Sequence, residues 1–200
     1  LMEDRLLFQR ILDVLGNGTP LRDMDLSDVE SSSIRMYSFL TLKPVLVLFN
    51  VGEDGDHNVD IQYNHHHSDQ MALQAKLEME ISQLPEDEVG IFMEEFGITD
   101  RAITRVIQAS YRLVNLQSFF TVGEDEVRAW TIPVGATAQE AAGTIHTDRA
   151  RGFIRAEVIP YDTLITVGDM VAARKAGQVQ IEGKTYLIQD GNIVHVRFSV

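Results

Sequence analysis

The sequence predicts an α/β segment followed by a smaller α+β segment of the β-grasp, ubiquitin-like kind. The α/β prediction rests on the run from Val45 to Phe49, a solid apolar stretch between Pro44 and a polar turn that contains glycine. Such a short run, rich in β-branched and aromatic residues, is typical of a strand buried on both faces of a parallel sheet. The α+β prediction rests on residues 120–200, where short strands surround a capped helix.

Two helices are predicted ahead of the buried strand. Apolar residues recur densely through residues 2–15, and Gly16-Asn17-Gly18 ends that pattern because these residues tolerate a left-handed backbone. Ser27 and Glu30 have the spacing of a capping box, which predicts a second helix that runs to about Phe39. The chain opens in the middle of a helical pattern, which favours a fragment of a longer protein.

Polar groups follow the predicted strand directly. In open α/β sheets, ligands bind just beyond the carboxyl ends of the strands. Asn50, Val51 and Glu53 are therefore candidates for a binding site. A plain strand-to-helix turn uses the same residue types for conformational reasons, so these residues alone leave both interpretations open.

Residues 54–70 show no convincing helical period. The run His65-His66-His67 within them suggests a metal site, since imidazole is a common ligand. Zinc sites space their ligands apart, and three adjacent side chains on a loop are not a preformed site. A solvated loop is the favoured interpretation.

Two amphipathic helices are predicted next. Pro85 and three acidic residues after it begin a helix that ends at Gly97, and a longer helix runs from about Asp100 to Gln117. We interpret both apolar stripes as core.

Strands and helices alternate after residue 120. The first predicted elements are a strand over Glu126–Ile132, a helix capped by Thr137 and Glu140 that runs to about His146, and a strand over Gly152–Ile159. They are followed by a short helix over Val171–Lys175, brief strands over Val179–Ile181 and Tyr186–Ile188, and a last strand over Ile193–Phe198.

Charge and composition exclude several classes of protein. The net charge is −13, and residues 124–200 hold 8 Lys/Arg against 10 Asp/Glu, a net of −2, which leaves −11 for residues 1–123. We therefore do not expect a protein that binds nucleic acids non-specifically, nor a DNA partner. Any contact with RNA is expected in the second half of the chain, which is close to charge balance. The absence of cysteine excludes disulfides and thiolate metal sites. The sequence has neither a membrane-spanning run nor a signal-peptide pattern, so we expect a cytoplasmic protein.

Two stretches resemble a known family. The block from Phe39 to Gly55 is similar to the base-recognition segment of the YchF-type, Obg-like branch of P-loop NTPases, in which N-x-x-E replaces the N-K-x-D motif of GTPases. The block Ala75-Lys76-Leu77-Glu78 is similar to the S-A-K-type segment that borders the base, although Gln74 stands where the family often has a small residue. An ordinary amphipathic helix over Leu77–Leu84 is the other interpretation of this stretch, and the two are compatible. The resemblance implies that Asn50, Val51, Glu53, Ala75 and Lys76 contact the nucleotide base.

The second resemblance covers Asn115 to Val200 and is carried by blocks such as Val127-Arg128-Ala129-Trp130-Thr131-Ile132 and Gly152-Phe153-Ile154-Arg155-Ala156-Glu157. It is similar to the TGS domain that closes the same proteins. The two resemblances together imply the end of a helical insertion domain over residues 1–37, the C-terminal part of a Ras-like nucleotide-binding domain over 38–119, and a TGS domain over 120–200.

The resemblance implies a ribosome-associated ATPase that uses ATP with Mg²⁺. Val51 replaces the lysine of N-K-x-D, and Glu53 is one methylene longer than its aspartate, so the bidentate grip on guanine is lost and ATP is expected in preference to GTP. Residual GTP use is the alternative. The chain alone is expected to be inactive, because Gly183-Lys184-Thr185 lacks the spacing of a phosphate-binding loop and Asp87-Glu88-Val89-Gly90 lies within a predicted helix.

The expected partner is the ribosome or rRNA, bound through the TGS domain. Arg149, Arg151 and Arg155 are the candidate contacts, although a normally charged surface would show the same residues. No membrane and no DNA partner are expected, and the protein is expected to be a monomer. A stand-alone TGS-type module that binds RNA, ribosome or protein without catalysis is the other function class.

Overall fold

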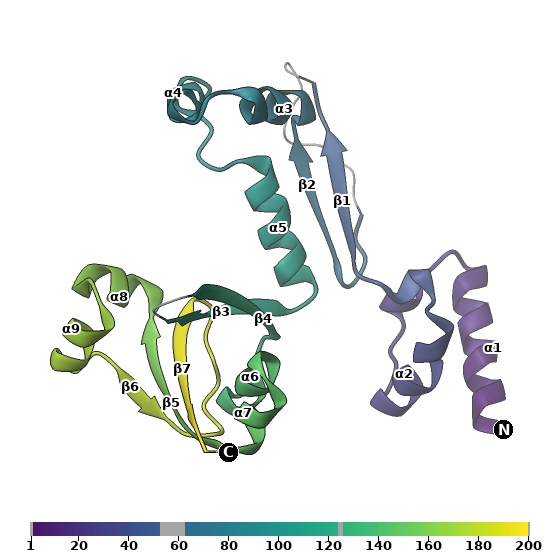
Figure 1. Cartoon of the computed structure of the whole chain (residues 1–200). Coiled ribbons are helices and arrows are strands. Elements are labelled where there is room, and N and C mark those ends of the chain that lie inside the picture. The colour runs from purple at the N-terminus through teal and green to yellow at the C-terminus, as the bar shows by residue number, and fades with distance from the viewer. Residues whose placement is uncertain (1, 53–62, 124–125, 200) are drawn as a thin grey trace. The chain divides into compact units, whose positions relative to one another are not determined.

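The computed structural model describes residues 2–52, 63–123 and 126–199. Its contacts divide the chain into two compact units, Leu1–Val114 and Asn115–Val200 (Figure 1). Glu53, one of the predicted base-site residues, lies outside the described residues.

The first unit begins with a small helical part. Its elements are α1 (Met2–Gly16), α2 (Asp28–Ile34) and the 3-10 turns η1 (Leu21–Asp23), η2 (Arg35–Tyr37) and η3 (Leu40–Leu42). Leu7, Ile11, Leu21 and Ile34 form its buried core. The predicted capping box at Ser27 is confirmed. The second helix is shorter than predicted, because 3-10 turns replace it after residue 34 and the backbone then turns left-handed at Ser38.

The predicted strand is β1 (Val45–Asn50), and it pairs in parallel with β2 (Ser68–Leu73). The expectation that β1 is buried on both faces is wrong for this chain, since Leu48 is 45% exposed. The physical reason is that the described part of the sheet has two strands, which cannot enclose each other. The sequence did not predict β2, because Ser68-Asp69-Gln70 lacks the β-branched residues that favour strands.

Three helices complete the first unit: α3 (Ala75–Gln83), α4 (Glu86–Glu95) and α5 (Ala102–Leu113). The helix start after Pro85 is confirmed. The last helix is shorter at both ends than the predicted span of residues 100–117. Its C-terminal end is cut short because Asn115 has a positive φ of 57° and Leu116 enters the next strand.

The second unit contains a mixed five-stranded sheet with the order β4-β3-β7-β5-β6. The strands are β3 (Leu116–Val122), β4 (Val127–Pro133), β5 (Phe153–Pro160), β6 (Gln180–Glu182) and β7 (Asn192–Phe198). The central pair β3 and β7 is parallel, and the other pairs are antiparallel. The first strand starts at Leu116, so this unit begins a few residues before the predicted boundary at 120.

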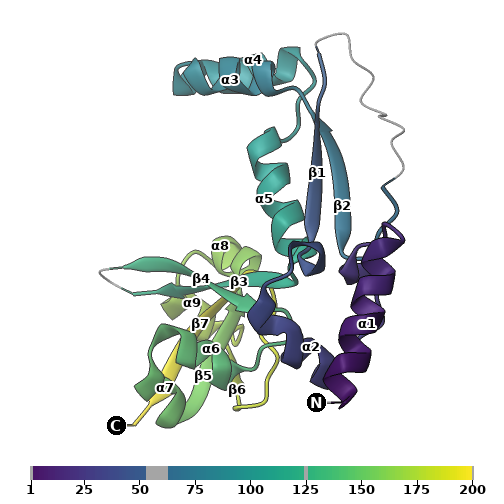
Figure 2. The ribbon, with the colours of Figure 1, turned by 90° about the vertical axis from the view of Figure 1, so that its right-hand side faces the viewer.

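Helices lie on both faces of this sheet. Figures 1 and 2 show α6 (Ala138–Ile145) and α7 (Thr147–Arg151) on one side, and α8 (Tyr161–Val167) and α9 (Met170–Lys175) on the other. The α6 side holds the larger core, which includes Phe119, Ile132 and Val158. The α8–α9 side holds a smaller core with Ile159 and Ile193. The capping box at Thr137 is confirmed.

The strand predicted over Tyr186–Ile188 is wrong. Leu187 makes only an isolated bridge with Thr137. Instead of pairing with a strand, the carbonyl of Tyr186 accepts a hydrogen bond of 2.8 Å from the N–H of Ala138 at the start of α6. This segment therefore caps a helix instead of extending the sheet.

Candidate nucleotide-base site

The parallel pairing of β1 and β2 places two sequence-distant segments at one edge of the sheet. Asn50 at the end of β1 is the register partner of Leu73 at the end of β2, and α3 begins two residues later. The Asn50 side-chain oxygen accepts a hydrogen bond from the backbone N–H of Ala75 at 3.1 Å. The backbone N–H of Val51 donates to the carbonyl of Leu73 at 2.9 Å. The structure thus brings Asn50, Val51 and Ala75 together.

Gln74 adds a further link between these segments. Its side-chain Nε2 donates to the carbonyl of Gly52 at 3.3 Å. Gln74 is also the N-cap residue of α3, where its side chain makes no capping hydrogen bond to the helix. The turn after β1 is consequently attached to the start of α3 through both side chains and backbone. In the sequence Gln74 stood out only as a departure from the family pattern, and its contact to Gly52 was not foreseen.

Lys76 lies on the first turn of α3. Its Nζ is 3.8 Å from the Glu80 carboxylate one helical turn later, and its side chain is two-thirds exposed. An exposed pair of this kind contributes little to stability. The structure therefore places four of the five predicted base-site residues at the sheet edge or on the adjoining helix.

A cavity of about 850 Å³ adjoins this edge of the sheet. Its lining includes Leu73, Gln74, Glu78 and Arg105. Glu78 accepts from the backbone N–H of Ala102 at 2.5 Å and lies 3.6 Å from Arg101, while Arg105 donates to the carbonyl of Ala72 at 3.1 Å. These charged groups hold α3, α5 and β2 in place. They were not predicted, because they lie on helices that the sequence reveals only by their apolar stripes.

The segment Gly183-Lys184-Thr185 is engaged elsewhere. The carbonyl of Lys184 accepts from the N–H of Gln139 at 3.3 Å, beside the Ala138–Tyr186 bond at the start of α6. A phosphate-binding loop presents backbone N–H groups to its ligand, whereas this segment presents carbonyls to a helix start. The geometry agrees with the prediction that the motif is a chance match. Asp87 to Gly90 lies inside α4, as predicted.

The histidine run is a loop, as predicted, with His66 and His67 exposed, but His65 is half-buried and has a partner. His65 Nδ1 lies 2.6 Å from the carboxylate of Asp23, and the backbone N–H of His66 donates to the same carboxylate at 2.7 Å. The hydrogen bond with His65 lowers the pKa of Asp23. In the described ranges no group of three or more potential ligands could hold a metal ion. The loop that precedes β2 is thus attached to Asp23 of η1, a contact that the sequence did not predict.

The three predicted RNA-contact arginines do not share one face of the sheet. Arg149 and Arg151 lie on α7, where the Arg149 guanidinium is 5.4 Å from the centre of the Phe198 ring. Arg155 lies on β5 next to Ala156, which is buried in the core on the α6 side. Because side chains alternate along a strand, Arg155 points to the opposite face. Its cross-strand partner there is Arg197.

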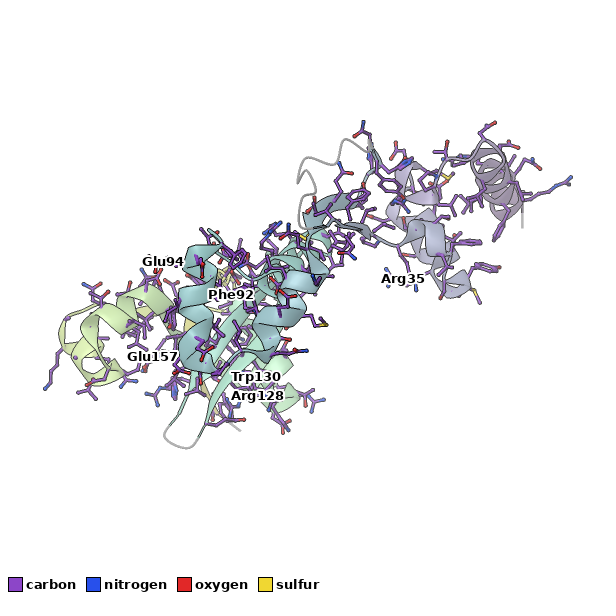
Figure 3. All side chains as sticks on the ribbon, turned by 90° about the horizontal axis from the view of Figure 1, so that it is seen from above. Arg35, Phe92, Glu94, Arg128, Trp130 and Glu157 are labelled. Atoms are coloured by element: carbon purple, nitrogen blue, oxygen red, sulfur yellow. The ribbon has the colours of Figure 1, made fainter. Side chains whose placement is uncertain are left out.

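An ion-pair cluster lies beside Arg155. Glu157 is 8% exposed and accepts from Arg174 Nη2 at 2.8 Å and from Arg197 Nε at 3.0 Å. Burial raises the pKa of Glu157, but the bonds from the two arginines lower it more, so it lies below its ordinary value. Glu157 is labelled in Figure 3. Arg128 and Trp130, which are labelled in the same view, form a separate contact on β4, with 4.2 Å between the guanidinium carbon and the ring centre. The Glu157 cluster was not foreseen from the sequence.

Comparisons with known proteins cover nearly the whole chain. The family described as YchF-GTPase_C, a protein of unknown function (DUF933), matches residues 116–199. The protein named "Ribosome-binding ATPase YchF" from Pasteurella multocida is 44% identical over 200 residues, which are 97% of this chain and 55% of that protein. The protein of the same name from Bacillus subtilis is 37% identical over 203 residues, with 97% of this chain and 56% of that protein covered.

A solved structure agrees in three dimensions. The YchF GTPase of Schizosaccharomyces pombe superposes with a TM-score of 0.82 and 29% identity, over 98% of this chain and 55% of that one. The chain belongs to the YchF family. It spans about half the length of the YchF relatives it matches.

The match to YchF proteins includes both units of the chain, since it covers 97% of the residues. Asn50 and Ala75 in the first unit and Arg155 in the second therefore belong to one YchF polypeptide. Within the described ranges, none of the helices of this YchF chain is long and apolar enough to cross a membrane.

Proposed function

We propose that the chain is the C-terminal portion of a ribosome-associated ATPase of the YchF family. It supplies the edge of the site that recognises the base, together with a ribosome-binding domain. The observation that carries this is the hydrogen bond between Asn50 and the backbone of Ala75, which joins the two segments expected to border the base. The names of the relatives, ribosome-binding ATPases, support both halves of the proposal.

The proposal assigns a domain to each part of the chain. Residues 1–37 end a helical insertion domain, and residues 38–119 end a Ras-like nucleotide-binding domain with β1 and β2 in its sheet. Residues 120–200 form a TGS domain of the β-grasp kind. The mixed sheet with α6 packed across one face supports that last assignment. Such a protein acts in the cytoplasm as a monomer, without membrane or DNA partners.

The described residues fit a purine base and do not fit a triphosphate. The carboxamide of Asn50 carries N–H donors besides the oxygen bound to Ala75, and purines present ring-nitrogen acceptors. Val51 places no ammonium group at the base, which supports ATP over GTP. The triphosphate and Mg²⁺ would be held by other parts of a longer protein, since Gly183-Lys184-Thr185 already caps α6. ATP with Mg²⁺ is the proposed ligand, and GTP is the alternative because the Schizosaccharomyces pombe relative is named a GTPase.

Base preference is tested on the protein from the longest reading frame that contains this chain. Its affinities for labelled ATP and GTP are compared before and after Val51→Lys combined with Glu53→Asp. The double change rebuilds the bidentate acceptor for guanine, so the affinity ratio should move toward GTP. An unchanged ratio would show that this turn does not read the base.

Catalysis is tested on the 200-residue chain alone. It should release no phosphate from ATP or GTP but should still co-sediment with ribosomes. Phosphate release by a preparation free of contaminating ATPase would overturn the assignment of Gly183-Lys184-Thr185. If the longer protein also lacks hydrolysis while both bind ribosomes, the alternative of a binding module without catalysis is correct. The separate sheet and cores of Asn115–Val200 favour that alternative.

A further inference from the structure

The sheet of the second unit is covered by α8 and α9 at one end of one face. Ile159 of β5 and Ile193 of β7 are buried there against Leu164 and Ala173. The next residues along the two strands on the same face form two cross-strand pairs. These residues, which we name the β5–β7 face, are Arg155 paired with Arg197, and Glu157 paired with His195. Both arginines and the histidine are exposed.

The β5–β7 face is positively charged although the chain as a whole carries −13. Arg155, Arg197 and the adjoining Arg174 from α9 bring three positive charges, and Glu157 brings one negative charge. The pKa of Glu157 is lowered, which keeps it ionised. Burial, followed by the nearby Arg197, lowers the pKa of His195, which keeps it neutral at pH 7. The sum is a local charge of +2 on a surface within an acidic protein.

The arrangement of these arginines is unfavourable for the fold alone. Like charges directly opposite each other on neighbouring strands are destabilising, and Arg155 is opposite Arg197. Glu157 compensates in part, with one carboxylate oxygen on Arg197 and the other on Arg174. The same bonds orient the two guanidinium groups, yet their side chains stay 47% and 44% exposed. The result is a set of fixed, accessible guanidinium groups.

We propose that the β5–β7 face, with Arg174, binds the phosphate backbone of RNA. Guanidinium groups match phosphate oxygens in geometry and charge. Here they are distributed over β5, β7 and α9, so that each can contact a different phosphate of one RNA strand. Ile181 of β6 is the cross-strand partner of Glu157 on this face and is 65% exposed, which offers an apolar contact for ribose or base. The inference rests on the proposed ribosome association and names the surface responsible for it.

The test compares two variants of the 200-residue chain with equal loss of charge. The first is Arg155→Gln with Arg197→Gln on the β5–β7 face, and the control is Arg151→Gln on α7 with Lys184→Gln, two exposed residues that do not act on His195. Fluorescence anisotropy measures the affinity of each for a labelled oligouridylate across a series of KCl concentrations. For single strands the slope of log K against log salt changes by roughly 0.7 per phosphate contact, so the first variant should lose about 1.4 from the slope. The control should keep the wild-type slope.

Stability and the state of His195 are measured on the same samples. The melting midpoint of the β5–β7 variant shows whether loss of the Arg197 bond to Glu157 destabilises the fold more than removal of the like-charge pair stabilises it. If the midpoint falls below that of the control, Arg155→Gln alone is used, since Glu157 bonds to Arg174 and Arg197, and the expected loss of slope is then about 0.7. Oligouridylate should also raise the pKa of His195 in NMR titrations. The charged groups around this imidazole are Arg197, Glu157, Arg174 and Arg149, and a bound phosphate adds negative charge to them.

Three outcomes would overturn the inference. Equal loss of slope in both variants would mean a diffuse field, and no loss in the β5–β7 variant would place the contact elsewhere. Competition by polyglutamate as effective as that by oligouridylate would indicate an acidic protein partner. Co-sedimentation with ribosomes shows whether such a result refutes only the proposed RNA-binding face or also the proposed ribosome association. If the wild-type chain and the β5–β7 variant sediment equally well, ribosome association stands and the face is wrong, whereas failure of the wild-type chain refutes the function itself.

Discussion

Gly152 is predicted to be the least replaceable glycine of the second unit. It precedes β5 at the point where the end of β7 passes, and a Cβ added to it would lie 1.8 Å from the carbonyl oxygen of Ser199. Ordinary contact begins at 3.4 Å, so the two backbones would have to separate by about 1.6 Å. That movement breaks the hydrogen bond from the Ser199 N–H to the Gly152 carbonyl, now 2.9 Å long. It also disturbs the adjacent pair of Phe153 and Phe198.

The expected cost of Gly152→Ala follows from these two effects. The lost hydrogen bond costs about 1 kcal/mol, and forcing a methyl group into a filled site costs about 1–3 kcal/mol. The free energy of unfolding of the second unit should therefore fall by about 2–4 kcal/mol. Urea denaturation followed by the fluorescence of Trp130 reports on this unit alone, since Trp130 is the single tryptophan of the chain and packs against the α6-side core.

Gly183→Ala is the matched control. A Cβ at Gly183 meets nothing within 4 Å, so the stability should stay within about 0.5 kcal/mol of wild type. If Gly152→Ala unfolds at the same urea concentration as this control, the end of β7 moves aside freely and the close approach is not a constraint.

Three further changes test other contacts. Glu157→Gln should destabilise the second unit by about 1–2 kcal/mol at pH 7, because the bonds to two half-exposed arginines weaken. Since the folded pKa of Glu157 lies below the unfolded value of 4.5, its contribution is present above that pH and is lost as the pH falls through the folded pKa, so the two proteins should converge in acid. A constant difference across pH would contradict this. Thr137→Ala removes the side-chain cap of α6 and should cost about 1 kcal/mol in thermal unfolding, whereas an unchanged midpoint would mean the cap contributes nothing. Asn50→Ala removes the acceptor for Ala75 N–H and should weaken ATP binding by the longer protein about 5–10-fold, equivalent to one hydrogen bond, so unaltered affinity would exclude Asn50 from the site.

Local chemistry made much of the fold predictable from the sequence. Capping boxes depend on residues three positions apart, so Ser27 with Glu30 and Thr137 with Glu140 identified two helix starts without any knowledge of the fold. The alternation of residues 193–198 likewise identified β7. The candidate base site was predictable at the level of its residues, because Asn50 follows a strand whose apolar run is unmistakable.

The tertiary structure decided which distant residues meet. The parallel register of β1 and β2 brings Asn50 to Ala75. The sequence of β2 is too polar to predict a strand there, so this pairing could not be predicted. Because side chains alternate along β5, Arg155 lies on the opposite face of the sheet from α7, which carries Arg149. The register of β5 and β7 instead pairs Arg155 with Arg197, forty-two residues later in the chain. His65 likewise became the partner of Asp23. Sequence patterns report the few residues that interact within a helical turn or along a strand, whereas charge pairs and sheet registers depend on chain segments that approach only when the whole unit packs.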